Sequence, residues 1–178
     1  MKLYTYFRSS AAYRVRIALN LKGLTAEHVP VHLVNNGGEQ HSESYREINA
    51  SELVPTWAEQ EFVLTQSLSI LEYLEEKFPD TALLPQDLQQ RALIRAFSLS
   101  IACDIHPLNN LRVLQYLTGT LEVSDAQKTA WYKHWVLTGF KALEAQLEQS
   151  NGKFCFGSQP TLADCCPVSY THLRAHET

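Results

Sequence analysis

The sequence predicts two parts, an α/β first half and an all-α second half. Short runs of β-favouring residues alternate with helical periods through residues 1–82, whereas every long segment from Leu88 onward has a helical period. The pattern breaks between Pro79 and Pro85, and no long linker or internal repeat follows. We therefore expect one domain at 1–82 and a second, helical domain at 88–166.

The first half is expected to contain strands and helices in the order β-α-β-α-β-β-α. The predicted strands are Leu3–Phe7, His28–Leu33, Val54–Trp57 and Phe62–Leu64, and the predicted helices end at Leu21, Ile48 and Pro79. The strands are rich in β-branched and aromatic residues, and Gly23 supplies a stop after the first helix. Ser67 is expected to cap the last helix, whose apolar residues recur at helical spacing.

In the second half, two apolar stripes indicate helices that each bury one face. The stripes are Leu93, Ile94, Phe97 and Ile101, and Trp131, Trp135, Leu137 and Phe140. Pro160–Asp164 has the pattern of a capping box and predicts a long buried helix, but Pro167 interrupts it. Because the residues that follow have no apolar stripe, we expect a non-native tail at 167–178, similar to translated vector sequence.

Composition limits the classes of partner. The 178 residues are 45% hydrophobic and carry a net charge of −4, and the basic residues are dispersed, which argues against nucleic acid. No apolar run approaches the roughly 20 residues that span a bilayer, and the N-terminus lacks a secretory pattern. We therefore expect a cytoplasmic protein with no membrane partner. The four cysteines show no zinc-ligand spacing, so no metal site is expected.

Paired serines, Ser9 and Ser10, lie between the first strand and the first helix. A hydroxyl at a helix start can cap free backbone amides, and these amides together with the helix dipole favour negative charge. We therefore expect an anion to be bound and activated at this helix start.

Two further positions in the first half suit a peptide-like ligand. Val54-Pro55 precedes a strand, where a cis bond would turn the Val54 backbone outward, although a trans proline that enters an edge strand is the favoured alternative. Gln66 and Ser67 begin a helix and can hold a carboxylate, although N-capping alone explains the serine equally well.

The order and spacing of these positions resemble the glutathione site of glutathione transferases. Phe7–Leu19 resembles the signature of the zeta class of that family, and Asp104–Asn110 resembles a helical-domain segment of its bacterial members. The resemblance extends from Lys2 to about Cys166. It implies a thioredoxin-like N-terminal domain that binds glutathione, a helical domain that shapes the substrate pocket, and a homodimer.

Residue matching within this resemblance implies a role for each candidate. Ser9 would stabilise the glutathione thiolate, with Ser10 beside it. The residues matched to ligand binding are Gln40, Val54, Pro55, Gln66, Ser67, His106, Asn110 and Arg112. Lowering a thiol pKa from about 8.5 by about two units requires roughly 2.7 kcal/mol. A charged hydrogen bond and a helix dipole together supply about this much.

The resemblance also implies a reaction, the glutathione-dependent cis–trans isomerisation of maleylacetoacetate to fumarylacetoacetate. Thiolate adds to the double bond of a cis-enoyl dicarboxylic or diketo acid, the resulting single bond rotates, and elimination restores glutathione, which is therefore a cofactor. Arg8 and Arg112 are the candidates to stabilise the enolate charge. The enzymatic alternatives are maleylpyruvate isomerisation and general glutathione transfer. A further alternative is a truncated, inactive chain that retains at most glutathione binding.

Ala11 departs from the family pattern, which usually places a cysteine directly after the two serines. Without that thiol, disulfide reduction is not expected, whereas the hydroxyl route through Ser9 remains. Tyr6 is the rival activator, because several transferase classes use a tyrosine from the first strand.

Overall fold

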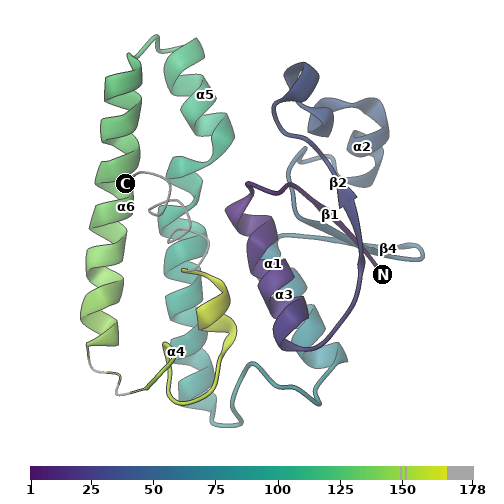
Figure 1. Cartoon of the computed structure of the whole chain (residues 1–178), viewed down its shortest axis with the longest axis vertical. Helices are drawn as coiled ribbons and strands as arrows, with labels where there is room; N and C mark the ends of the chain where they lie inside the picture. Colours follow the sequence, from purple (N-terminus) through teal and green to yellow (C-terminus); the bar gives the residue numbers. More distant parts are fainter. Residues whose placement is uncertain (149, 151, 168–178) are drawn as a thin grey trace. The chain divides into compact units, whose positions relative to one another are not determined.

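The chain divides after Leu84 into two units in the computed structural model (Figure 1). The described residues are 1–148, 150 and 152–167. The first unit contains Met1–Leu84 and the second contains Pro85–Cys166. The expected tail at 167–178 lies, apart from Pro167, outside the described residues.

The first unit is built on a four-stranded mixed sheet with the strand order β2-β1-β3-β4. The strands are β1 (Lys2–Thr5), β2 (Glu27–Pro30), β3 (Thr56–Glu59) and β4 (Phe62–Thr65). Strand β1 is parallel to β2 and antiparallel to β3, and β3 is antiparallel to β4. The helices are α1 (Ser10–Leu21), α2 (Glu43–Ile48) and α3 (Ser67–Lys77), with 3₁₀ turns η1 (Asn35–Gly37) and η2 (Glu39–His41) before α2. The predicted thioredoxin-like order β-α-β-α-β-β-α is therefore confirmed.

The pairing register brings four chain segments to one edge of this sheet. The parallel strands β1 and β2 both end there, and the Val31 amide donates to the Thr5 carbonyl at 2.8 Å. Thr56, the first residue of β3, pairs with Tyr4 of β1 and with Thr65 of β4. The chain consequently leaves β1, β2 and β4, and enters β3, at the same edge.

Helices α1 and α3 pack against each other and lie side by side in Figure 1. The residues of the first unit that are fully buried include Leu3, Ala12, Val15, Ala18, Trp57, Ile70, Leu71 and Leu74. Burial of each large apolar side chain contributes about 1.5–3 kcal/mol. This core fixes where the N-termini of α1 and α3 lie.

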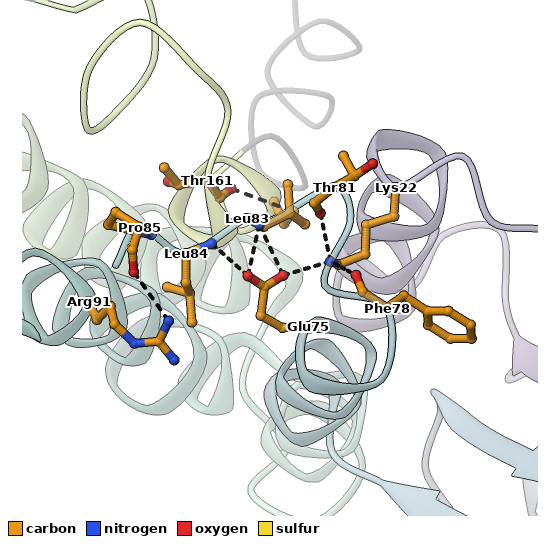
Figure 2. Close-up of polar contacts among 10 residues, drawn as sticks. Lys22, Glu75, Phe78, Thr81, Leu83, Leu84, Pro85, Arg91 and Thr161 are labelled. Atoms are coloured by element: carbon orange, nitrogen blue, oxygen red, sulfur yellow. Dashed lines mark hydrogen bonds and ion pairs between the residues drawn. The ribbon is translucent and has the colours of Figure 1, made fainter. Parts of the chain in front are cut away.

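A buried ion pair joins the end of α1 to α3. The Lys22 ammonium lies 2.7 Å from the Glu75 carboxylate, and the two side chains are 1% and 7% exposed. Lys22 also donates to the carbonyls of Phe78 and Thr81, and Glu75 accepts from the amides of Leu83 and Leu84. Figure 2 shows the Glu75 carboxylate between the ammonium and these amides. The pair therefore fixes the segment that ends the first unit.

The second unit is helical, as predicted. Its elements are α4 (Leu88–Leu99), a π-helix η3 (Ser100–Ile105), the 3₁₀ turn η4 (Pro107–Asn109), α5 (Leu111–Gly119), α6 (Asp125–Leu147) and the 3₁₀ helix η5 (Leu162–Cys165). Its buried core includes Ile94, Phe97, Ile101, Ile105, Leu117 and Leu143.

The two predicted apolar stripes are only partly buried. Leu93 is 53% exposed and Leu137 is 54% exposed, so the prediction was wrong for these two residues. The reason on α4 is that Ile94, Phe97 and Ile101 are spaced at i, i+3 and i+7 and define the buried face, while Leu93 lies one residue outside it.

The predicted capping box is present at the start of η5. The Thr161 amide and hydroxyl both donate to the Asp164 carboxylate, at 2.8 and 2.9 Å. The helix it begins is a four-residue 3₁₀ helix that ends at Cys165, two residues before the interrupting Pro167, and not the long helix that the pattern predicts. Within the described part of the chain, no helix combines the length and apolarity needed to cross a bilayer.

Candidate functional site

The candidate residues of the first unit gather at one edge of the sheet. Ser9 and Ser10 follow β1, and Gln40 lies in η2, after β2. Pro55 directly precedes β3, and Gln66 directly follows β4. Because these strand ends share one edge, the topology brings together residues that are widely separated in the sequence.

Ser9 is the N-cap of α1, and the cap expected from the serine pair is therefore made by its first member. Its backbone is extended, with φ −76° and ψ 113°, and its Oγ accepts a hydrogen bond from the Ala12 amide at 3.1 Å. Because the oxygen accepts, the hydroxyl proton can be donated to another group. The first turn of α1 carries no acidic side chain that would compete for the positive end of the helix. Ser10, half-buried, is the first residue of the helix.

The Val54-Pro55 peptide bond is cis. The trans alternative, which the sequence favoured, is therefore wrong. Val54 is 9% exposed and packs in an apolar cluster with Tyr6, Val31 and Tyr45. In the described part of the chain, no residue hydrogen-bonds to the Val54 amide or carbonyl. Both groups can therefore pair with an extended, peptide-like ligand.

Gln40 is 5% exposed, and its side-chain amide is held by its neighbours. Nε2 donates to the Leu33 carbonyl at 3.3 Å and lies 3.0 Å from His41 Nε2. Its Oε1 is buried without a hydrogen-bond partner among the described residues. A buried carbonyl oxygen of this kind is suited to accept an N–H from a ligand.

Gln66, and not Ser67, is the N-cap of α3. Gln66 has the left-handed φ of 70°, and its side chain makes no capping hydrogen bond. Ser67 is the first helical residue, so the prediction that it caps the helix was wrong by one position. The physical reason is that its hydroxyl has another partner: Ser67 Oγ accepts from Arg14 Nη1 at 3.1 Å. A strained non-glycine backbone at a helix start is typical of a ligand site.

Arg14 is a site residue that the sequence reasoning missed. Its side chain is 1% exposed, and Nε and Nη2 have no hydrogen-bond partner among the described residues. The sequence does contain a sign of this burial. Arg14 lies three residues after Ala11 and four before Ala18, which places it on the apolar face of α1. A charge on a buried face needs a partner.

Arg8 directly precedes Ser9 and is exposed. The remaining candidates lie in the second unit, around the start of α5. Asn110 is the N-cap of α5, and its Oδ1 accepts from the Arg112 amide at 3.1 Å. Asn110 Nδ2 lies 3.4 Å from His106 Nε2. The Arg112 side chain is exposed. These three residues therefore form one local group.

The cysteines provide no second reactive centre that the geometry supports. Cys103 is exposed, and Cys155 is half-buried, with its backbone amide donating to the Asp164 carboxylate at 2.8 Å. Burial, together with the nearby Asp164 carboxylate, raises the pKa of the Cys155 thiol to about 12. Among the residues that the structure describes, no group of three or more His, Cys, Asp or Glu side chains is arranged to hold a metal ion.

Comparison with known proteins identifies close relatives. Residues 3–82 match the family described as glutathione S-transferase, N-terminal domain. The chain is 50% identical over 166 residues to a probable maleylacetoacetate isomerase of Vibrio cholerae, covering 93% of this chain and 77% of that protein. It is 45% identical over 168 residues to a maleylpyruvate isomerase of a Ralstonia species, covering 93% of this chain and 78% of that protein.

Solved structures give the same result. The holo structure of a maleylpyruvate isomerase, described as a bacterial zeta-class glutathione S-transferase, matches with a TM-score of 0.94 and 42% identity over 99% of this chain and 83% of that chain. A maleylacetoacetate isomerase of Methylobacterium extorquens with bound malonate and glutathione matches with a TM-score of 0.92 and 37% identity, again over 99% and 83%.

Proposed function

We propose that this chain, which belongs to the zeta class of the glutathione S-transferase family, catalyses glutathione-dependent cis–trans isomerisation of maleylacetoacetate to fumarylacetoacetate. The observation that carries the proposal is Ser9, whose hydroxyl caps α1 at the sheet edge to which Val54 and Gln66 also belong. The 50% identity to a probable maleylacetoacetate isomerase supports this choice of substrate.

The polar groups at this edge fit glutathione as the cofactor. Gln40 Oε1, a buried acceptor without a partner among the described residues, suits an amide N–H of the tripeptide. The Val54 backbone groups suit the cysteinyl part, since they can pair with an extended peptide. Gln66 and Ser67, at the start of α3, suit a carboxylate.

When bound, glutathione supplies a thiolate that adds reversibly to the conjugated double bond and so allows rotation about it. Ser9 stabilises that sulfur by donating its hydroxyl proton, because its oxygen already accepts from Ala12. The hydrogen bond contributes about 1.5–3 kcal/mol and the helix dipole about 0.3–1 kcal/mol. Their sum matches the roughly 2.7 kcal/mol that a two-unit decrease in thiol pKa requires.

Arg8 and Arg112 are proposed to stabilise the negative charge that develops on the substrate when the thiolate adds. Both side chains are exposed, and Arg8 is adjacent to the thiolate-stabilising Ser9. A fixed cation near a developing negative charge lowers the barrier of such an addition. His106 and Asn110 line the substrate side in this proposal, and Ser10 supports Ser9.

Maleylpyruvate is the second candidate substrate. The 45% identity to a maleylpyruvate isomerase and the TM-score of 0.94 with a holo structure of that activity favour it specifically. The two substrates share the cis-enoyl dicarbonyl group, so the same residues would act on both. General glutathione transfer by the same thiolate is the remaining enzymatic alternative.

The test is an assay of the purified chain with both maleyl substrates in the presence of glutathione. The expected result is isomerisation that depends on glutathione and is faster with maleylacetoacetate. A rate no higher than that of free glutathione on both substrates would contradict the proposal. Binding of glutathione without any isomerisation would favour the alternative of an inactive chain that retains only the glutathione site.

Assembly and location are proposed on the same basis. We infer a homodimer in the cytoplasm, which the family resemblance supports. Sedimentation of the purified chain tests the assembly, and a single species with the mass of one chain would contradict it. The domain limits 1–82 and 88–166 are likewise retained as a proposal.

A further inference from the structure

We infer that Arg14 is a positioning residue of the glutathione site. Its buried guanidinium donates to the Ser67 hydroxyl, which in turn donates to the α-carboxylate of the γ-glutamyl group of the ligand. The negative charge of that carboxylate compensates the positive charge of Arg14. The inference rests on the proposed function, because it assumes glutathione as the ligand. It adds to the site a buried residue whose hydrogen-bond partner, Ser67, is one of the proposed binding residues.

The first observation is that the guanidinium is buried without compensation. Arg14 is 1% exposed, and its side chain donates one hydrogen bond, from Nη1 to Ser67 Oγ at 3.1 Å. Nε and Nη2 are buried and have no hydrogen-bond partner among the described residues, and no carboxylate of these residues forms an ion pair with the guanidinium. A buried, unpaired charge is strongly unfavourable, so a partner from outside the chain is expected.

The second observation is that positive potential converges where Arg14 lies. Arg14 is in the second turn of α1, and its hydrogen-bond partner Ser67 is the first residue of α3. The N-termini of both helices carry partial positive charge. Neither helix has an acidic side chain in its first turn. The guanidinium and the N-terminus of α3, where its partner Ser67 lies, together therefore form a site for an anion.

The third observation is the direction of the hydrogen bond. Because Ser67 Oγ accepts from Arg14, its hydroxyl proton is left to be donated to a ligand. A hydroxyl polarised by a guanidinium is a stronger donor than a hydroxyl alone. Gln66, with a φ of 70°, turns the backbone immediately before this hydroxyl. The geometry points to a carboxylate as the acceptor at the start of α3.

The test compares two ligands in binding experiments by calorimetry. One is glutathione, and the other is 4-aminobutanoyl-cysteinyl-glycine, which lacks only the α-carboxylate of the γ-glutamyl group. The wild type is expected to prefer glutathione. Arg14→Met is expected to decrease that preference by about tenfold to a hundredfold, the factor of one charge-assisted hydrogen bond. Its affinity for the analogue is expected to change by less than about threefold, since the analogue never used the charge.

Two further variants separate charge from packing. Arg14→Lys keeps a cation and is expected to retain part of the preference. Arg16→Met removes an arginine from the same helix, whose Nη2 donates to the Phe7 carbonyl, and is expected to leave the preference unchanged. Thermal unfolding without ligand gives an independent readout. Arg14→Met is expected to raise the midpoint, because it replaces an uncompensated buried charge by an apolar side chain of similar volume.

The outcomes distinguish this inference from the proposed function. If the wild type binds glutathione with the stated preference but isomerises neither substrate, the proposed function fails and the role of Arg14 stands. If Arg14→Met lowers the unfolding midpoint and leaves the ligand preference within twofold of wild type, Arg14 has only a packing role and the inference is overturned. A wild type that does not discriminate between the two ligands, or that binds neither, overturns it as well.

Discussion

At the residue scale, Ser9 uses its hydroxyl oxygen and its hydroxyl proton for different partners. The oxygen accepts from the Ala12 amide and so caps α1, while the proton is available to a thiolate. One side chain thereby stabilises the helix and activates the ligand. The proposed activation of the thiolate does not use a protein thiol. Ala11 can therefore occupy the position where the family pattern has a cysteine.

We predict that Ser9→Ala raises the pKa of bound glutathione by about one to two units, because about 1.5–3 kcal/mol of thiolate stabilisation is lost. Tyr6→Phe should leave this pKa unchanged, since Tyr6 is 8% exposed and packs among apolar side chains. The measurement is the ultraviolet absorbance of the thiolate as a function of pH.

A control is needed because the same hydroxyl caps α1. Replacing an N-cap serine by alanine destabilises a helix by about 0.5–2 kcal/mol, whereas glycine does so by only a few tenths. Ser9→Gly should therefore raise the thiol pKa as Ser9→Ala does, with less loss of stability. An unchanged thiolate pKa in both variants would remove Ser9 from the mechanism and favour Tyr6.

The pKa of Cys155 leads to a second prediction at this scale. Burial raises this pKa to about 12, so at pH 9 only about one thiol in a thousand is ionised. Iodoacetamide should therefore modify the exposed Cys103 of the native protein well before Cys155, and Cys155 should react only after denaturation. Peptide mass spectrometry measures both rates. Equal rates for Cys155 in native and unfolded protein would show that the fold does not protect it.

At the element scale, α1 and α3 are joined at both ends by polar contacts. Arg14 and Ser67 connect the helices near their N-termini, and Lys22 and Glu75 connect them near their C-termini. The second connection is internally compensated, because Glu75 supplies the charge that Lys22 needs (Figure 2). The first is not. This difference separates a structural pair from a pair that is completed by a ligand.

We predict that Glu75→Gln destabilises the protein by about 3–5 kcal/mol, because it leaves the Lys22 ammonium buried without a counter-charge. The double variant Lys22→Met/Glu75→Gln should recover part of this loss. Urea denaturation of the two single variants and the double variant measures the coupling. As a control, Lys128→Met removes an ion pair with Asp125 on the surface of α6 and should leave the midpoint nearly unchanged. A similar small change in Glu75→Gln would contradict the role assigned to the buried pair.

The elements themselves were predictable from the sequence, because alternation and helical periodicity are local signals. The strand and helix order of the first half follows from residues such as Trp57 and Ile70, whose burial the pattern requires. Other features depend on distant contacts. The cis state of Pro55 was not predictable, since the trans form is favoured by about 0.5–1 kcal/mol in the absence of tertiary context. Ser67 was wrongly expected to cap α3, because its hydroxyl bonds to Arg14. That partner is 53 positions away in the chain, so the local sequence does not reveal it.

At the scale of the whole molecule, the candidate residues are divided between the two units. Ser9, Gln40 and Val54 belong to the first unit, whereas Asn110 and Arg112 belong to the second. The sequence predicted this division because its motifs lie on both sides of the break near Pro85. If the proposed site uses both units, glutathione must stabilise more than the first unit alone.

We predict that glutathione at about 100 times its Kd stabilises the folded protein by about 2.7 kcal/mol, which slows hydrogen exchange of the most protected amides about a hundredfold. Amides of α1 and α3 should gain this protection. Amides at the start of α5, around Asn110, should gain protection too if this segment contributes to the site. Hydrogen exchange followed by peptide mass spectrometry measures both regions in one experiment. Ser9→Gly is the matched control. This variant should still bind glutathione, but with a smaller fraction of the glutathione thiol ionised. Protection confined to Met1–Leu84 would favour a chain that binds glutathione through its first unit only, and absence of protection in α1 and α3 would contradict the site itself.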